Sequence, residues 1–351
     1  MTLRIFGMSF VVSIAALVAA FLYGGSTAVL LTLVLGVLEV SLSFDNAVIN
    51  ATVLQRMSDF WQRMFLTIGV IIAVFGMRLA FPLGIVWLTA GLDPVDALHL
   101  ALNPPTDGSP TYESIVTAAH PQIASFGGMF LLMLFLGFLF EDKELTWLSW
   151  IERPLLRIGR LREAPVVVAL TILVLAATLV APDHDTSTVM VAGVLGVITY
   201  IVVNGLGRLF HIETESGDGP TALAKATGRA GFFLFLYLEV LDASFSFDGV
   251  IGAFAITADP IIIALGLGLI GAMFVRSLTI YLVHRGTLSE YVFLEHGAHW
   301  AIGALALLLL YSLGTEVPET VTGLIGLVLI LASLATSIVY RRRNHTEGVH
   351  I

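Results

Sequence analysis

Two acidic residues interrupt a long apolar stretch near the N-terminus, and a second pair does the same about two hundred residues later. The first pair is Glu39 and Asp45 in LEVSLSFDN, and the second is Asp242 and Asp248 in LDASFSFDG. An ionised group at mid-bilayer costs from roughly 3 to more than 10 kcal/mol unless it is paired or hydrated. We therefore expect these carboxylates, together with the neighbouring Glu239, to have binding partners.

The residues around these acids also carry oxygen. Serines and asparagines recur within the two motifs, and the chain has no cysteine. Carboxylate, carbonyl and water ligands favour Mg²⁺, Ca²⁺ or Mn²⁺, whereas zinc and copper sites usually recruit His or Cys. The sequence therefore predicts a site for a hard divalent cation. Its expected ligands are Glu39, Asp45, Asn46, Asp242 and Asp248, with Ser43, Ser246, Glu239 and Asn50 as auxiliary groups.

Arg78 and Arg276 lie in the apolar segments that follow the two motifs, at similar distances from them. We expect them to balance two of the five acids, which leaves an excess of about three negative charges for a divalent cation or for protons. Pairing that only holds the bundle together remains an alternative. Two arginines, however, cannot neutralise five acids.

The spacing within the first motif places a demand on its helix. Glu39 and Asp45 are six residues apart, so on a straight helix they point about 120° away from each other. Both can face one ion only if the helix is locally unwound, unless different helices complete two separate sites. We predict that the helix carrying Asp45 is tilted or broken. In the second motif, Gly249 is the candidate break point.

The composition is that of a multi-pass membrane protein. The 351 residues are 57% hydrophobic and 12% charged, and the mean hydropathy is +0.94, whereas soluble domains carry about 25% charged residues. The net charge of −9 argues against nucleic acid as a partner. The expected partners are the lipid bilayer and a metal ion, and a homo-oligomer or another membrane-protein partner stays open.

Ten hydrophobic segments follow one another along the chain. If the N-terminus lies inside, all but two of the 17 basic residues fall on the cytoplasmic side and none falls in an outer loop. This distribution follows the positive-inside rule. It predicts about ten transmembrane helices with both termini cytoplasmic, in the plasma (inner) membrane of the cell. The predicted segments are 4–22, 27–55, 63–90, 118–140, 164–181, 187–206, 230–257, 260–284, 296–313 and 319–340.

The two motifs align position by position. When EVSLSFDNAV is set over DASFSFDGVI, Glu39 aligns with Asp242 and Asp45 with Asp248. Five predicted helices per half is an odd number, so the halves must run in opposite directions. Inverted repeats with polar sites at their interface are the architecture of secondary transporters. We therefore predict an all-α membrane helix bundle of two inverted five-helix repeats, residues 1–182 and 183–351.

Three other features carry weaker functional signals. Segment 141–163 mixes tryptophans, leucines and basic residues, which is typical of an amphipathic stretch at the cytoplasmic interface. His296 and His299 have a spacing that suits a metal or a proton shuttle, although ordinary structural roles are commoner. The N-terminal segment is either a signal peptide or, as the repeat requires, a retained helix.

The paired motifs resemble those of the TerC family of integral membrane proteins, which is named for tellurium resistance. EVSLSFDNAV resembles the first signature of that family, and LDASFSFDGVIGAFAIT resembles the second, with glycine where the first has asparagine. The resemblance implies a membrane protein of metal-ion homeostasis, associated with manganese export and tellurite resistance. It also implies site roles for Glu39, Asp45, Asn46, Asp242 and Asp248.

These observations predict a transporter rather than an enzyme. We expect the protein to export a divalent cation, with Mn²⁺ as the first candidate, and to exchange the metal for protons. We expect no prosthetic group. One alternative is a membrane assembly scaffold, or a partner in stress or tellurite resistance, that does not transport. Another is an intramembrane aspartyl protease with Asp45 and Asp248 as its dyad. Against the protease, FDN and FDG lack the G-x-G-D form of that motif.

Overall fold

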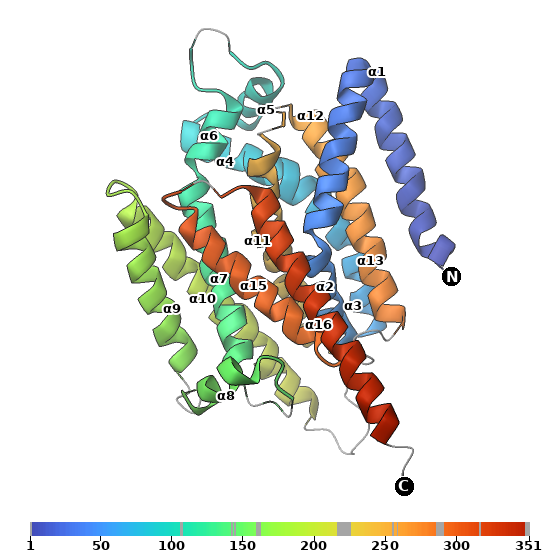
Figure 1. Ribbon diagram of the computed structural model, residues 1–351. Coiled ribbons are helices and arrows are strands. Elements are labelled where there is room, and N and C mark those ends of the chain that lie inside the picture. The colour runs from blue at the N-terminus through green and yellow to red at the C-terminus, as the bar shows by residue number, and fades with distance from the viewer. Residues whose placement is uncertain are drawn as a thin grey trace.

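The chain is helical throughout the part that the computed structural model describes, and it forms a bundle (Figure 1). The described residues form no strand, and Met57 and Ala226 are joined by an isolated bridge. The all-α prediction is confirmed. The side chains of some helical residues, including Asp45 and Asp248, are outside the description. The described residues are 2–105, 108–141, 143, 145–158, 163–215, 226–254, 256–257, 259–285, 291–315 and 317–347.

The first two predicted segments form a helical hairpin followed by a break. Helix α1, Thr2–Leu42, reverses direction at Gly24 and Gly25, where Gly25 adopts a φ of 67° (Figure 1). That left-handed conformation favours glycine. Ser43 then leaves the helical conformation, with φ −93° and ψ 19°, and α2 continues as Phe44–Gln55. The helix is therefore broken between Glu39 and Asp45, as their spacing predicts.

The third predicted segment consists of several short helices. Helix α3, Asp59–Met64, leads into two π-helices, η1 at Phe65–Gly69 and η2 at Ile72–Ala80, and α4 follows at Phe81–Ala90. π-helical turns are rare, and they frequently mark functional sites. Arg78 lies in η2.

Short helices cap one end of the bundle. Helix α5, Pro94–Leu102, begins at Asp93, whose carboxylate accepts hydrogen bonds from two backbone N–H groups of the first turn. Helix α6, Tyr112–Ala118, begins with a capping box at Thr111. Both helices lie at the end where α1 reverses, opposite the C-terminus (Figure 1).

The centre of the bundle is an apolar core. Helix α7, His120–Phe140, packs against α15, Leu294–Tyr311. The side chain of Phe135 lies directly against Gly303, where a Cβ atom would come 2.6 Å from Phe135 Cγ. Since protein interiors are closely packed, glycine at this position permits the close approach of the two helices.

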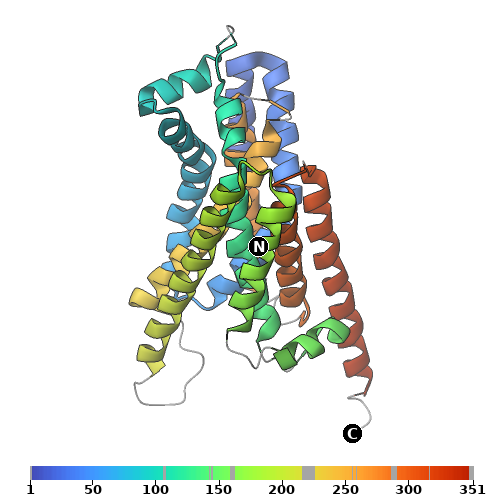
Figure 2. The same ribbon diagram turned by 90° about the vertical axis from the view of Figure 1, so that its left-hand side faces the viewer.

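The middle of the chain runs along the side of the bundle and across its end. Helix α8, Ser149–Ile158, lies across the end that bears the C-terminus, close to α16 (Figure 2). It is followed by α9, Ala164–Leu175, by π-helix η3, Ala176–Val180, and by α10, Thr186–Glu215. Helix α10 packs against α7 and α11.

The second motif lies on an unbroken helix. Helix α11, Gly228–Ala253, runs through Gly249 without interruption, so the break predicted at Gly249 is wrong. Glycine costs an α-helix only about 1 kcal/mol, so its presence alone does not require a break. The elements that follow are α12 at Pro260–Ile263, η4 at Ala264–Gly271, α13 at Ala272–Arg285, α15, and α16 at Glu319–Glu347.

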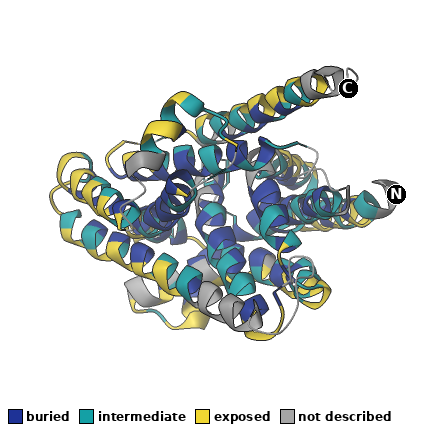
Figure 3. Cartoon of the chain, turned by 90° about the horizontal axis from the view of Figure 1, so that it is seen from below, coloured by how far each residue is buried: buried dark blue, intermediate teal, exposed yellow. Residues whose placement is uncertain are grey.

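Each of the ten predicted segments is mainly helical where the structure describes it, apart from the break at Ser43 and non-helical residues at some ends. Six helices of the described chain are long and apolar enough to cross a membrane, and one of them contains the reversal of α1. Exposed side chains lie mainly around the periphery and buried ones at the centre (Figure 3). The chain is thus a multi-pass membrane protein. The candidate spans are Ile5–Val40, His120–Phe140, Thr186–Gly205, Pro260–Val283, Leu294–Tyr311 and Leu324–Arg342.

The N-terminal arm of α1 is packed onto the bundle. The Ser9 hydroxyl lies 2.7 Å from the Ser277 hydroxyl and donates a hydrogen bond of 2.7 Å to the Met273 carbonyl. The Ser277 hydroxyl donates in turn to the Ile5 carbonyl at 3.0 Å. These hydrogen bonds join the N-terminal arm of α1 to α13.

Candidate functional site

The two acidic motifs meet inside the bundle. Asp242 of α11 accepts hydrogen bonds at Oδ1 from Asn46 Nδ2 at 2.8 Å and from Asn50 Nδ2 at 3.1 Å. All three side chains are buried. Asn46 and Asn50 are four residues apart, so one face of α2 presents both amides to α11. Helix α2 therefore supplies the donors and α11 the charge.

A small cavity lies beside this cluster. Its volume is about 30 Å³. One water molecule needs about 10–15 Å³ on the same scale, so the cavity has room for one or two waters or for a single ion. It is too small for a peptide or an organic substrate. The polar residues that line it are Asn46, Asn50, Arg78, Asp242, Ser246, Arg276 and Thr279.

Glu39 is neutralised by the protein itself. Its Oε1 atom forms a buried ion pair with Arg78 and accepts a hydrogen bond of 2.9 Å from the Ser43 hydroxyl. Arg78 also donates to the Ala73 carbonyl at 3.0 Å. Gly271 of η4 lies so close to the Glu39 side chain that a Cβ atom there would overlap it. The predicted charge-balancing role of Arg78 is therefore present, with Glu39 as the partner.

Arg276 occupies a different position. Its Nε atom donates a hydrogen bond of 2.6 Å to the Leu66 carbonyl in the π-helix η1. Arg276 is also one of the residues that line the cavity. Arg276 therefore brings a positive charge to the cavity from α13, while a main-chain carbonyl fixes its orientation.

Glu239 is the most isolated of the described acids. It is buried on α11, one turn before Asp242, and neither carboxylate oxygen has a hydrogen-bond partner among the described residues. Its Oε1 atom lies against Gly69 of η1, where a Cβ atom would approach within 2.6 Å. Glu239 is not among the residues that line the cavity. The structure thus separates it from the Asp242 cluster.

Asp45 and Asp248 lie on α2 and α11, and their side chains are outside the described residues. Among the groups that are described, no set of three His, Cys, Asp or Glu residues converges on one point. The charged residues described at the cavity are Arg78, Arg276 and Asp242, and Arg78 is paired with Glu39. A divalent cation would therefore gain ligands here only if the asparagine amides rotated and Arg276 moved aside.

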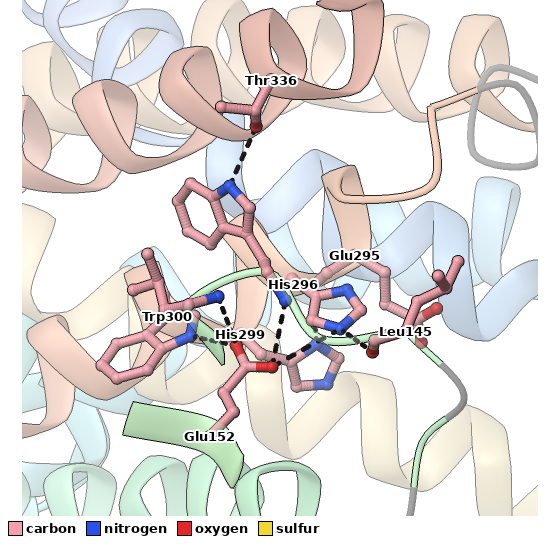
Figure 4. A network of polar contacts seen from close by, with 9 residues as sticks. Leu145, Glu152, Glu295, His296, His299, Trp300 and Thr336 are labelled. Carbon is pink, nitrogen blue, oxygen red and sulfur yellow. Dashed lines mark hydrogen bonds and ion pairs between the residues drawn. The ribbon is translucent and has the colours of Figure 1, made fainter. Parts of the chain in front are cut away.

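A second polar cluster lies at the end of the bundle that bears α8 (Figure 4). Glu152 is 1% exposed, and its carboxylate accepts hydrogen bonds from the Trp300 indole at 3.0 Å and from the Trp147 backbone N–H at 3.1 Å. His296 Nε2 lies 3.9 Å from Glu152 and donates to the Leu145 carbonyl at 3.0 Å. Through Glu152, this network joins α8 to α15.

The other predicted histidine has a structural role. His299 Nδ1 donates to the Glu295 carbonyl at 2.8 Å, and its ring stacks on Phe138 with the centroids 3.8 Å apart. Lys143 Nζ lies 3.0 Å from the centre of the same Phe138 ring. Burial lowers the pKa of Lys143 to about 8. These contacts use both histidines in packing and hydrogen bonding.

Sequence reasoning missed three features of these sites. Glu152 sits within the predicted amphipathic stretch 141–163, and nothing in that pattern distinguishes a buried carboxylate from a solvated one. The π-helix that presents the Leu66 carbonyl to Arg276 also has no sequence signal. Thr279, which lines the cavity, follows Arg276 by three residues and lies on the same face of α13, and this spacing was the available clue.

Comparison with known proteins places the chain in a family. Residues 44–344 match the family described as protein of unknown function DUF475. The chain belongs to this family. The DUF475 match covers both acidic motifs from Phe44 onward and every cavity residue. No curated protein and no solved structure matches the chain.

Proposed function

We propose that this DUF475 protein is a transporter of hard divalent cations, with Mn²⁺ as the first candidate, and that it exports the ion from the cell. The proposal is based mainly on the two buried hydrogen bonds that Asp242 accepts from the amides of Asn46 and Asn50. It lies at a buried cavity with room for a single ion. A site of this size suits an ion better than any larger substrate.

The donors can change their role without leaving their positions. Rotation of an asparagine amide by 180° exchanges its NH₂ group for its carbonyl oxygen. Asn50 Oδ1 is buried and has no hydrogen-bond partner among the described residues. The rotation therefore breaks no hydrogen bond at Oδ1. Asp242, the rotated amides and the Ser246 hydroxyl then form an all-oxygen ligand set. Such sets favour Mn²⁺, Mg²⁺ or Ca²⁺.

Asp45 and Asp248 complete the proposed site. They occupy equivalent positions of the two motifs: Asp45 lies six residues after Glu39, and Asp248 lies six residues after Asp242. Their carboxylates would supply the negative charge that the described groups lack, since Arg78 is paired with Glu39 and Arg276 adds a second positive charge at the cavity. Glu39 then serves the site through Arg78 and Ser43, which it holds in place.

We propose that the two halves, residues 1–182 and 183–351, are inverted repeats and rock around this site. The alignment of the two motifs, in which Glu39 corresponds to Asp242, supports the proposal. Two contacts join the halves: Glu39 of α1 packs on Gly271 of η4, and Glu239 of α11 packs on Gly69 of η1. Each half thus places an acid against a glycine in a π-helix of the other half. Inverted repeats place ion sites at such interfaces. We further propose that both termini are cytoplasmic and that the membrane is the plasma (inner) membrane.

The sequence resemblance agrees with this proposal. The motifs are similar to those of TerC proteins, which points to metal-ion homeostasis, while the DUF475 description names no substrate. We propose that the ion is substrate rather than cofactor, that protons are exchanged for it, and that the protein is not an enzyme. The motifs FDN and FDG, which lack the G-x-G-D form, argue against peptide cleavage by Asp45 and Asp248.

A binding measurement on the purified protein tests the ligand set. Isothermal titration with Mn²⁺, Ca²⁺, Mg²⁺ and Zn²⁺ is expected to give binding of the hard cations that Asn50→Leu weakens about tenfold, which is 1.4 kcal/mol. Asn103→Leu, at an exposed asparagine that ends α5, is the matched control. Zn²⁺ binding that exceeds Mn²⁺ binding and ignores Asn50→Leu would contradict the oxygen site.

A further inference from the structure

Glu239 poses a problem that the metal site does not solve. The carboxylate is 6% exposed and lies on a helix in the interior of the bundle. Neither of its oxygens has a hydrogen-bond partner within the described residues. A buried ionised carboxylate without donors is strongly disfavoured, and the usual relief is to take up a counter-charge or a proton.

Comparison with Glu39 sharpens the problem. Both acids pack against a glycine of a π-helix, Glu39 on Gly271 and Glu239 on Gly69. Glu39, however, has a cation and a hydroxyl as partners, Arg78 and Ser43. The corresponding place beside Glu239 is taken by apolar η1, whose sequence is FLTIG. Among the described residues, Glu39 has a paired cation and Glu239 has no ion-pair partner.

The surrounding charges favour the neutral form of Glu239. Helix α11 also carries Arg229, Tyr237, Asp242 and Asp248, and the packed elements add Asp45 of α2, Arg78 of η2 and Tyr200 of α10. Arg78 is already paired with Glu39. Residues 121–140 of α7 and all of η1 carry no charge, α3 carries Asp59 and Arg63, and α16 has its charges at its ends. Among the described groups, Asp242 lies three residues from Glu239 on the same helix, and its charge disfavours a second ionised carboxylate there.

A proton fits this place better than a metal ion. Mg²⁺ and Ca²⁺ take six or more oxygen ligands, and Glu239 has no described hydroxyl, amide or carboxylate partner. A proton needs only one carboxyl oxygen. Because Gly69 has no Cβ atom, Glu239 Oε1 can lie against η1 without a clash, and a bound proton adds no further heavy atom to this contact.

We propose that Glu239 is a proton-binding site separate from the metal site, and that it carries the proton exchanged for the transported cation. The proton binds one Glu239 oxygen and neutralises it, and its release to solvent in the opposite conformation regenerates the carboxylate. This inference rests on the proposed transport. It differs from a shared site, in which one carboxylate would release metal and then take up the proton.

Proteoliposomes with a trapped pH-sensitive dye test the separation. In the wild type, an imposed Mn²⁺ gradient is expected to move Mn²⁺ and drive protons the other way. In Glu239→Gln, downhill Mn²⁺ flux should stay within about threefold of the wild type while Mn²⁺-driven proton movement falls at least tenfold. Glu163→Gln, the same change at an exposed residue before α9, should alter neither flux.

The possible failures are distinguishable. Proton coupling that persists in Glu239→Gln overturns this inference and leaves the transport proposal intact. Loss of Mn²⁺ flux together with coupling also overturns it, because Glu239 would then act as a metal ligand. Coupling to Na⁺ instead of protons overturns it as well. Absence of Mn²⁺ flux in the wild type overturns the transport proposal itself.

Two measurements do not depend on flux. Infrared difference spectra of the wild type should contain the band of a protonated, buried carboxyl group, and Glu239→Gln should lack it; an unchanged band would overturn the assignment. Gly69→Ala, whose Cβ would lie 2.6 Å from Glu239 Oε1, should shift that band. Gly84→Ala has nothing within 4 Å and should leave the band unchanged.

Discussion

Asn46 Nδ2 donates a hydrogen bond of 2.8 Å to Asp242 Oδ1, although the two residues are 196 positions apart in the chain. The bond joins the first acidic motif to the second inside the bundle. The helix break at Ser43 lies three residues before Asn46, a candidate ligand on α2. A local break beside a polar joint is the arrangement expected of a membrane transport site.

The Glu39–Arg78 ion pair is expected to behave as a buried pair. Glu39→Gln leaves Arg78 without its counter-charge, and breaking such a pair costs about 3–5 kcal/mol. The double change Glu39→Gln/Arg78→Met removes both charges and should recover most of that loss. Thermal unfolding of the purified proteins in detergent measures the relative stabilities of the wild type, the single variants and the double variant. A double variant less stable than both single variants would contradict this role.

Gly271 is expected to be intolerant of a side chain. A Cβ atom there would overlap Glu39, and overpacking of this kind costs about 1–3 kcal/mol. Gly271→Ala should therefore lower the unfolding temperature, while Gly84→Ala, which meets nothing within 4 Å, should not. Equal unfolding temperatures for the two variants would show that α1 and η4 are not packed as described.

Lys143 predicts a pH dependence of stability. Burial lowers its pKa to about 8 in the folded protein, from 10.5 when unfolded. Between these values the unfolded chain binds more protons, so this group makes stability rise with pH through that interval. Below about pH 8 both states are protonated and the penalty is constant.

Unfolding temperatures recorded across that interval check the prediction. Lys143→Met should raise stability near neutral pH and abolish the rise contributed by this group. The same slope in wild type and variant would mean that Lys143 is solvated. The change lies at the end of the bundle, close to Phe138, and not at the cavity.

The sequence predicts the helices well because a bilayer leaves little choice. Apolar runs of sufficient length must be helical there, since their backbone groups have no water to bind. The break at Ser43 was also predictable, because two acids six residues apart cannot share one face of a straight helix. The break expected at Gly249 is wrong, since glycine permits a break without requiring one.

The site itself was predictable only as a set of residue types. The choice of Asn46 and Asn50 as donors to Asp242 depends on the register of α2 against α11. That register is set by packing among distant segments, such as Gly271 on Glu39. The π-helix that turns the Leu66 carbonyl toward Arg276 likewise follows from tertiary packing. No local pattern encodes these relations.

Flux of Mn²⁺ into proteoliposomes tests the central claim most directly. The wild type is expected to transport Mn²⁺, and Asp45→Asn, Asp242→Asn and Asp248→Asn should each reduce the rate at least tenfold, equivalent to about 1.4 kcal/mol or more. Asp183→Asn, the same change at an exposed residue after η3, should transport normally. Wild-type rates from correctly inserted Asp242→Asn protein would contradict the account.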